Sequence, residues 1–284
     1  MKFDSYIVSE TKTALSVPMP QEILPKKKTF KQKAFTLAET LITLSIIGVV
    51  AAMTVPTLMG NVTKQQNYVA LKKAYNQLQN AIKMIPILEG CSSGDYDCAG
   101  MFDWENVTNI GNMDFQGDLG RKHTYLLAQQ FKAQKVCIEG HEPAKDCHKG
   151  IEKGYLSGGT LRYDSAFIAQ DGTIYISSGG HGFYVDVNGN KGPNEYGIDI
   201  FAFWLAAEST DSIQQGTLMP WGSKLSATYA ASKGLNSINI SGFEYWKDAD
   251  KCTSQKLTSK GQWGNNGLFC TGRVLEEGGI KYDF

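Results

Sequence analysis

The chain of 284 residues lacks the short motifs on which the common enzyme classes depend. It has no Gly-x-Ser-x-Gly of a serine hydrolase and no Gly-Lys-Ser/Thr phosphate-binding loop. Its four histidines, His123, His141, His148 and His181, stand in polar or turn-like contexts without a neighbouring nucleophile motif. The sequence therefore gives no support to an enzymatic function.

Charge is missing from a long stretch near the N-terminus. No charged side chain occurs from Thr40 to Thr63, a run of 24 residues rich in Leu, Ile, Val, Ala and Met. A helix needs roughly 20 residues, at about 1.5 Å each, to cross the hydrocarbon core of a membrane. A signal peptide would have a shorter apolar core, about 7–15 residues, and a cleavage site on its far side. We therefore predict a helix that stays in the membrane.

Net charge is also absent, since 28 basic residues balance 28 acidic ones, but the two parts of the chain differ. Residues 1–34 contain seven lysines and three acidic residues, a net of +4, which leaves a net of −4 for the rest. Basic residues before an apolar run predict a cytoplasmic leader and a body outside the membrane. A mildly acidic body without a basic stripe gives no support to a nucleic-acid partner.

Glu39 stands just before this uncharged run. A carboxylate inside a membrane span costs on the order of 3 kcal/mol, so it needs a partner. If the chain is cut after Ala34, the new amine of Phe35 lies about one helical turn from Glu39. Glu39 could then pair with its own amine or with the amine of a neighbouring subunit.

The segment KAFTLAETLITLSIIGVVAAMTVP resembles the N-terminal processing and assembly segment of type IV pilins and type II secretion pseudopilins. The resemblance implies that Ala34 precedes the cleavage site and that Phe35 becomes N-methylated. It also implies that Glu39 is the assembly glutamate and that Pro56 kinks the helix. Two features depart from the family pattern: Ala34 stands where Gly is usual, and the leader of 34 residues is long.

The resemblance implies a structural subunit that is cut by prepilin peptidase and assembled by an inner-membrane platform into a helical fibre with other pilin-like subunits. The expected location is the bacterial inner membrane, and after assembly a periplasmic or cell-surface fibre. A type II secretion pseudopilus and a type IV pilus both remain open. The alternative is a monomeric membrane-anchored ectodomain that binds a ligand or a surface, which predicts no cleavage at Ala34 and no dependence on Glu39.

Three regions follow from these patterns: a leader at 1–34, a transmembrane and assembly helix at 35–60, and an extracytoplasmic globular domain at 61–284. Beyond the membrane, apolar residues at three- and four-residue steps extend the helix, and Pro86 is expected to end it. The predicted stripe comprises Val62, Val69, Ala70, Ala74, Tyr75, Leu78, Ala81, Ile82 and Ile85.

Short apolar runs predict a sheet between residues 160 and 206. Asp171-Gly172 is a hairpin signal between the strands 166–168 and 173–176, and runs at 183–187 and 198–205 predict two more strands. A shorter helix is expected at 122–133, whereas 137–150 and 216–279 have the composition of irregular segments. The predicted fold class is α+β and pilin-like, with the long helix packed on an antiparallel meander of three or four strands.

All six cysteines follow the apolar run, and an even number in an exported body favours disulfides. Pairing of nearest neighbours would join Cys91 to Cys98, Cys137 to Cys147, and Cys252 to Cys270. Zinc is the alternative, but the sequence has no Cys-x-x-Cys.

One loop has the alternating oxygen ligands of a calcium (Ca²⁺) site: Asp186, Asn188 and Asn190, with Asp199 or Glu195 to complete the shell. It is not an EF-hand, because Lys191 and Gly197 occupy the sixth and twelfth positions. Resemblance to the major pseudopilins implies calcium in a loop of the C-terminal sheet. The alternative is a loop in which Asn and Asp bond their own backbone.

The tryptophans leave a similar choice open. They could form a carbohydrate- or partner-binding surface, or they could be core and interface anchors. The residues concerned are Trp204, Trp221, Trp246 and Trp263.

Overall fold

The computed structural model describes residues 36–103, 119–138, 144–148, 165–178, 181–234, 245–249, 252, 267 and 269–282. Contacts divide the chain into two compact units, Met1–Ala52 and Met53–Phe284. The predicted leader, Ala34 and Phe35 lie outside the described residues.

Helix α1 (Leu37–Leu88) is 52 residues long and confirms the predicted N-terminal helix. The prediction that Pro86 ends it was wrong, because the helix continues to Leu88. The actual end is at Gly90, whose φ of 79° allows the Cys91 amide to bond the Pro86 carbonyl at 2.8 Å. Because the φ of proline is compatible with a helix, Pro86 does not end α1, and the helix ends at the turn that Gly90 forms.

The sheet has six antiparallel strands in chain order, β1-β2-β3-β4-β5-β6. Strands β2 (Ser165–Ile168), β3 (Ile174–Ser178), β4 (Gly182–Asp186) and β5 (Ile200–Leu205) are the four that the sequence predicted. The two outer strands, β1 (Lys135–Cys137) and β6 (Leu218–Pro220), were not predicted. Each is three residues long and offers no periodic signal of its own.

The β2–β3 connection differs in detail from the predicted two-residue turn. The Ala169 amide bonds the Thr173 carbonyl at 2.9 Å, which leaves three residues in the loop. Of these three loop residues, 170–172, only Gly172 has a positive φ, 87°. The Asp171 carboxylate instead accepts the Thr173 amide at 3.1 Å. Asp171 therefore stabilises the turn through its side chain.

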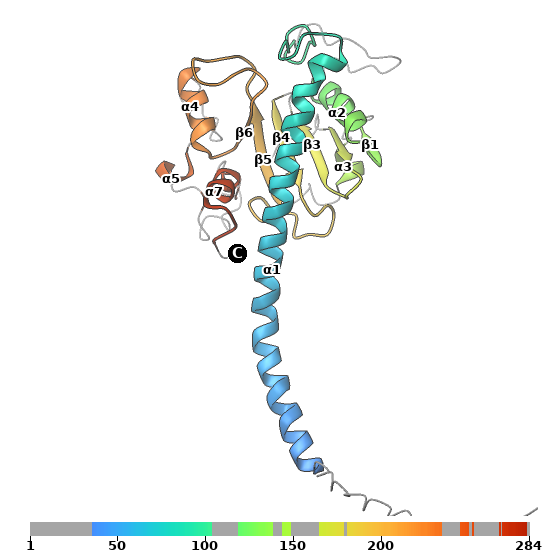
Figure 1. Ribbon diagram of the computed structural model, residues 1–284, viewed down its shortest axis with the longest axis vertical. Helices are drawn as coiled ribbons and strands as arrows, with labels where there is room; N and C mark the ends of the chain where they lie inside the picture. The colour runs from blue at the N-terminus through green and yellow to red at the C-terminus, as the bar shows by residue number, and fades with distance from the viewer. Residues whose placement is uncertain are drawn as a thin grey trace, which may run out of the picture. The chain divides into compact units, whose positions relative to one another are not determined.

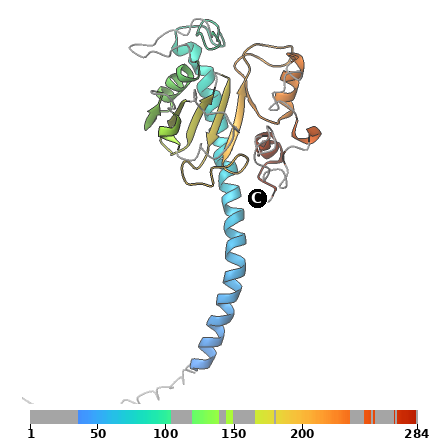
Figure 2. The ribbon, with the colours of Figure 1, turned by 180° about the vertical axis from the view of Figure 1, so that it is seen from behind.

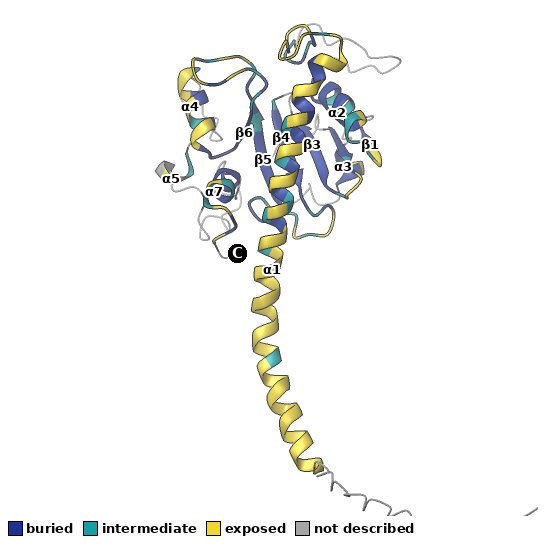
Figure 3. Cartoon of the chain, in the orientation of Figure 1, coloured by how far each residue is buried: buried dark blue, intermediate teal, exposed yellow. Residues whose placement is uncertain are grey.

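One face of the sheet is covered by α1 and by α2 (Leu119–Gln130), as Figures 1 and 3 show. Inward residues of the strands, such as Phe167, Tyr175, Phe183 and Phe203, pack against the buried seam of α1. That seam comprises Asn67, Leu71, Ala74, Leu78, Ala81, Ile82, Ile85 and Pro86.

The prediction of a buried stripe on α1 was wrong for two of its members. Val62 and Val69 are 47% and 57% exposed, so they lie off the seam that faces the sheet. The predicted helix at 122–133 is α2, three residues earlier in the chain.

The other face of the sheet buries a second cluster that includes Ile174, Ile176, Tyr184 and Trp221. The short helix α3 (Ala144–Cys147) contributes to it, within the segment that was expected to be a loop. Figure 2 shows this side.

The segment 216–279 was predicted to be irregular, and that was wrong for its described parts. It contains β6 and the helices α4 (Lys224–Ser232), α5 (Trp246–Ala249) and α7 (Cys270–Glu277). Helix α7 packs very closely: the Gly272 amide bonds the Trp221 carbonyl at 2.8 Å, and a Cβ on Gly272 would lie 2.3 Å from the Ser223 nitrogen. Tertiary contacts of this kind order short helices whose composition favours loops.

Three disulfides join Cys91 to Cys98, Cys137 to Cys147 and Cys252 to Cys270. These are the nearest-neighbour pairings. The second disulfide fastens α3 to the outer strand β1.

Candidate functional sites

The first candidate site is the start of α1, where Thr36 and Glu39 form a capping box. The Thr36 amide and hydroxyl both donate to Glu39 Oε2 at 2.9 Å, and the Glu39 amide donates to Thr36 Oγ1 at 3.2 Å. This reciprocal pattern satisfies amides that a helix N-terminus would otherwise leave without partners. Glu39 therefore has a partner within its own chain, and its pairing with the amine of a cleaved Phe35 stays a prediction.

The helix that follows exposes an apolar surface. Its hydroxyl groups bond back to the preceding turn, for example Thr40 Oγ1 to the Leu37 carbonyl at 2.8 Å and Ser45 Oγ to the Leu41 carbonyl at 2.9 Å. Among the described residues, α1 is long and apolar enough to cross a membrane. Twelve large apolar side chains are between 46% and 79% exposed: Leu37, Leu41, Ile42, Leu44, Ile46, Ile47, Val49, Val50, Met53, Val55, Leu58 and Met59.

The second candidate site is the loop between β4 and β5, which Asp199 organises. The Asp199 carboxylate accepts the Glu195 amide at 2.7 Å, the Asn194 amide at 2.9 Å and Asn188 Nδ2 at 3.1 Å. Asn188 Nδ2 also donates to the Gly192 carbonyl at 3.2 Å. The side-chain oxygens of Asn188 and Asn194 are buried and accept no hydrogen bond from any residue that the structure describes.

Asp186 lies next to this loop but has a different partner. Its Oδ2 lies 2.7 Å from His148 Nε2, and its Oδ1 accepts the Asn188 amide at 3.2 Å. Burial raises the pKa of Asp186, while the hydrogen bond and charge of His148 oppose the rise and the charge of Asp199 adds to it. Asn188 bridges the two carboxylates, since its amide donates to Asp186 Oδ1 at 3.2 Å and its Nδ2 donates to Asp199 Oδ2 at 3.1 Å.

Of the four predicted calcium ligands, the structure brings three together. Asn190 turns away, with its Nδ2 donating to the Cys147 carbonyl at 2.9 Å. No group of three or more His, Cys, Asp or Glu side chains suited to a metal ion occurs in the described part of the chain. Sequence reasoning missed His148 and Asn194, because neither belongs to the alternating pattern.

The segment 89–103, which follows α1, is held by two side chains of α2. The buried Lys122 ammonium donates to the carbonyls of Ala99 and Gly100 at 3.3 and 3.2 Å, and His123 Nε2 lies 2.7 Å from the Met101 carbonyl. Burial lowers the pKa of Lys122, although Glu89 and Asp103 act in the opposite direction.

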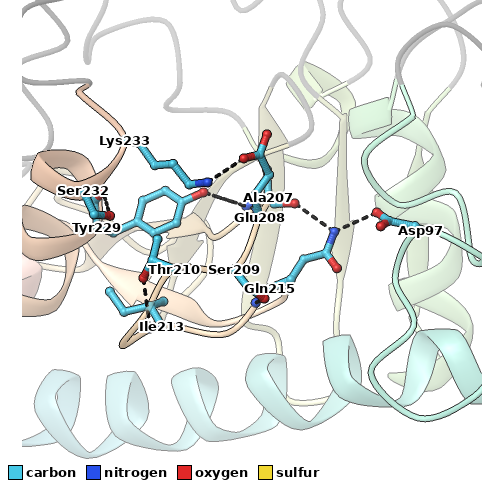
Figure 4. Close-up of polar contacts among 10 residues, drawn as sticks. All are labelled: Asp97, Ala207, Glu208, Ser209, Thr210, Ile213, Gln215, Tyr229, Ser232 and Lys233. Atoms are coloured by element: carbon cyan, nitrogen blue, oxygen red, sulfur yellow. Dashed lines mark hydrogen bonds and ion pairs between the residues drawn. The ribbon is translucent and has the colours of Figure 1, made fainter.

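The β5–β6 loop contacts the same segment, 89–103, through Gln215 and Asp97, as Figure 4 shows. Gln215 Nε2 donates to Asp97 Oδ1 at 2.8 Å and to the Ala207 carbonyl at 2.9 Å. The Tyr229 hydroxyl accepts the amides of Ala207 and Glu208 at 3.1 and 3.4 Å. These contacts connect the loop to α4 and to the segment after α1.

The other described histidine and the described tryptophans that the sequence singled out pack against neighbouring side chains. His181 stacks between Phe102 and Trp204, with ring centroids 5.6 Å away on both sides. Trp204 and Trp221 are neighbours at 6.1 Å, and Trp246 lies 5.1 Å from the Arg273 guanidinium. His141 and Trp263 lie outside the described residues.

Comparison with known proteins supports the first site. Residues 29–55 match the family model described as the prokaryotic N-terminal methylation motif. Comparisons with curated proteins and with solved structures found no match. The matched segment is the hallmark of prepilin-type N-terminal segments, and in this chain it precedes an α+β fold of pilin-like architecture.

Proposed function

We propose that this protein is a structural subunit of a type II secretion pseudopilus or a type IV pilus, and not an enzyme. Prepilin peptidase would cut between Ala34 and Phe35, and an inner-membrane platform would draw the mature chain into a helical fibre with other pilin-like subunits. The observation that carries this proposal is the methylation motif on a helix whose apolar side chains are exposed. Such a surface needs lipid before assembly and neighbouring helices after it.

Glu39 would serve in both states. Before assembly its carboxylate is held by the Thr36 amide and hydroxyl, which lowers the cost of a charge near the membrane. In the fibre it would exchange this contact for the cationic N-terminus of a neighbouring subunit. An unmatched charge in a core of low dielectric is costly, so this pair would set the register between subunits.

The first test is the mass of the mature N-terminus of the membrane-extracted chain from its own host. A terminus at Phe35 with one added methyl group supports the proposal. An intact leader, in cells with an active prepilin peptidase, would overturn it and favour the anchored binding module.

A second test uses Glu39→Val and Thr36→Val, with Thr36→Ser as the matched control. We expect the Glu39 variant to insert in the membrane but to be absent from fibres. Thr36→Val removes the hydroxyl bonds and should impair assembly, while Thr36→Ser keeps them. Normal incorporation of Glu39→Val into fibres would refute the register role.

We also propose that the β4–β5 loop binds calcium, through Asp199, Asp186 and the side-chain oxygens of Asn188 and Asn194. Two buried amide oxygens without donors beside two interacting carboxylates support this proposal. Calcium prefers such hard oxygen ligands and would offset the repulsion between the carboxylates. Asn190 is the predicted ligand that this proposal leaves out, because its amide bonds the Cys147 carbonyl.

The calcium proposal is tested by thermal unfolding of the full chain in detergent, with calcium chloride or with EDTA. At about 100 times the dissociation constant, binding adds about 2.7 kcal/mol to the free energy of unfolding. Asp199→Asn should abolish the shift, and Asp171→Asn, in a different loop, should retain it. An unchanged melting temperature at millimolar calcium would exclude the site.

A further inference from the structure

The two edges of the sheet differ in whether their outward backbone groups are hydrogen-bonded. At the β6 edge, side chains of α1 satisfy the outward backbone groups: the Leu218 amide donates to Gln79 Oε1 at 2.7 Å, and the Leu218 carbonyl accepts the Tyr75 hydroxyl at 3.2 Å. Gln79 Nε2 also donates to the Gly216 carbonyl at 3.2 Å. Pro220, on the same strand, has no amide to offer. This edge cannot pair with another strand.

Among the described residues, the opposite edge is open. There, strand β1 pairs with β2 alone, and Val136 lies opposite Phe167. The hydrogen bond from the Ala169 amide to the Thr173 carbonyl shows that alternate residues of β2, including Phe167, direct their backbone groups toward β3. The amide and carbonyl of Val136 therefore point away from the sheet. Within the described residues, no hydrogen bond reaches them.

A groove of about 590 Å³ adjoins this open edge. Its walls are the second half of α2 with the turn after it, the strand β1, and Asp146 of α3. Figures 1 and 2 both place α2 and β1 together at the side of the sheet away from α4 and α7. The apolar lining includes Tyr125, Ala128, Val136 and Ile138. Val136 is 42% exposed, so part of this lining faces solvent.

The charged groups at the groove favour an acidic ligand. Lys132 and Lys135 are exposed at its rim, and Asp146 is the single carboxylate among the lining residues. The Lys135 ammonium lies 2.5 Å from the backbone carbonyl of Asp146, which holds it at the groove.

We propose that the β1 edge and its groove bind an extended segment of a partner protein in which apolar and acidic residues alternate. The segment adds a seventh strand beside β1 and bonds the outward amide and carbonyl of Val136. Its apolar side chains lie on the α2 side, in the groove, and its carboxylates meet Lys132 and Lys135. Strand addition combines main-chain hydrogen bonds with pockets for alternate side chains, which is the pattern found here.

The test measures binding of fluorescein-labelled peptides to the full chain in detergent by fluorescence anisotropy. The probe is a hexapeptide of alternating Asp and Val, and the comparisons are a Lys-Val hexapeptide and an Asp-Val hexapeptide methylated on alternate backbone nitrogens. We expect saturable binding of the first peptide alone. Lys132→Glu with Lys135→Glu should weaken it about tenfold, and Gln129→Trp, which fills the groove, should abolish it. Lys83→Glu, an exposed charge reversal on α1, should change nothing.

Absence of binding by the Asp-Val peptide overturns the proposal. Equal binding of the methylated peptide excludes strand addition, and equal binding of the Lys-Val peptide excludes the role of the lysines. Self-association of the full chain that Gln129→Trp abolishes would replace the partner segment with a second copy of this chain.

Discussion

His148 Nε2 and Asp186 Oδ2 lie 2.7 Å apart, and neither side chain is exposed. The pair connects the residue after α3 to the last residue of β4, so it holds the disulfide-linked Cys137–Cys147 segment against the loop proposed to bind calcium. Burial of an ionisable group is costly unless the group is hydrogen-bonded or paired, and here each side chain supplies the partner of the other.

Removing one member of this pair should be strongly destabilising. His148→Ala leaves the Asp186 carboxylate buried with only the Asn188 amide, and we expect a loss of about 3 kcal/mol. Urea unfolding of the full chain, of both single variants and of the double variant with Asp186→Asn, measures the coupling. Additive losses in the double variant would contradict a direct interaction.

The ion pair between Lys73 on α1 and Asp171 in the β2–β3 loop predicts a dependence on pH. Burial alone would raise the pKa of Asp171, but hydrogen bonds from Lys73 and Thr173 and the charge of Lys73 lower it below the ordinary value of 3.8. A carboxyl with a lowered pKa stabilises the fold above its ordinary pKa, and this stabilisation is lost as pH falls through the lowered value.

The size of this effect is small, because the two side chains are 55% and 36% exposed. We expect less than about 1 kcal/mol. The free energy of unfolding at about pH 5 and about pH 3 should fall less for Asp171→Asn than for the unaltered chain, with Asp211→Asn as the exposed control. Identical slopes for all three proteins would disprove the assignment.

Gln79 and Gln77 on α1 are a matched pair of the same residue type. Gln79 bonds Leu218 of β6 through Oε1 and Gly216, just before the strand, through Nε2, whereas Gln77 is exposed. Gln79→Met leaves the Leu218 amide without a partner, and we expect a loss of about 1–3 kcal/mol. Gln77→Met should change stability by less than about 0.5 kcal/mol. Equal effects in chemical unfolding would mean that the edge contacts contribute nothing.

Lys132 occupies a position that usually favours glycine. Its φ is 48°, and the Ala133 amide bonds the Ala128 carbonyl at 2.9 Å, as in the turn that ends α1 at Gly90. Because a side chain is strained at such φ values, Lys132→Gly should stabilise the fold by about 0.5–1 kcal/mol. Thermal unfolding of this variant beside Gly278→Ala, which should lose stability at the equivalent turn after α7, provides the comparison.

Several features could be predicted from the sequence because they depend on neighbouring residues. The uncharged run from Thr40 to Thr63 predicts the exposed helix, and Thr36-x-x-Glu39 is a capping pattern. The strands from β2 to β5 have apolar alternation and turn signals of their own. The cysteines lie close enough in sequence for their nearest-neighbour pairs to be the simplest choice.

Other features depend on packing between distant segments. The predicted stripe of α1 included Val69 and left out Leu71, whereas the helix buries Leu71 with Ala74 and Leu78 against the sheet. The strands β1 and β6 and the helix α7 are too short to be stable alone, so they take their structure from the elements beside them. His148 and Asp186 are 38 residues apart, and nothing local relates them. The sequence by itself therefore determined the long apolar helix, the methylation motif at its start and the central hairpins, because those signals are local. The tertiary structure alone decided the buried pair, the closed edge at β6 and the open edge at β1, because burial and backbone pairing exist only once the chain has folded.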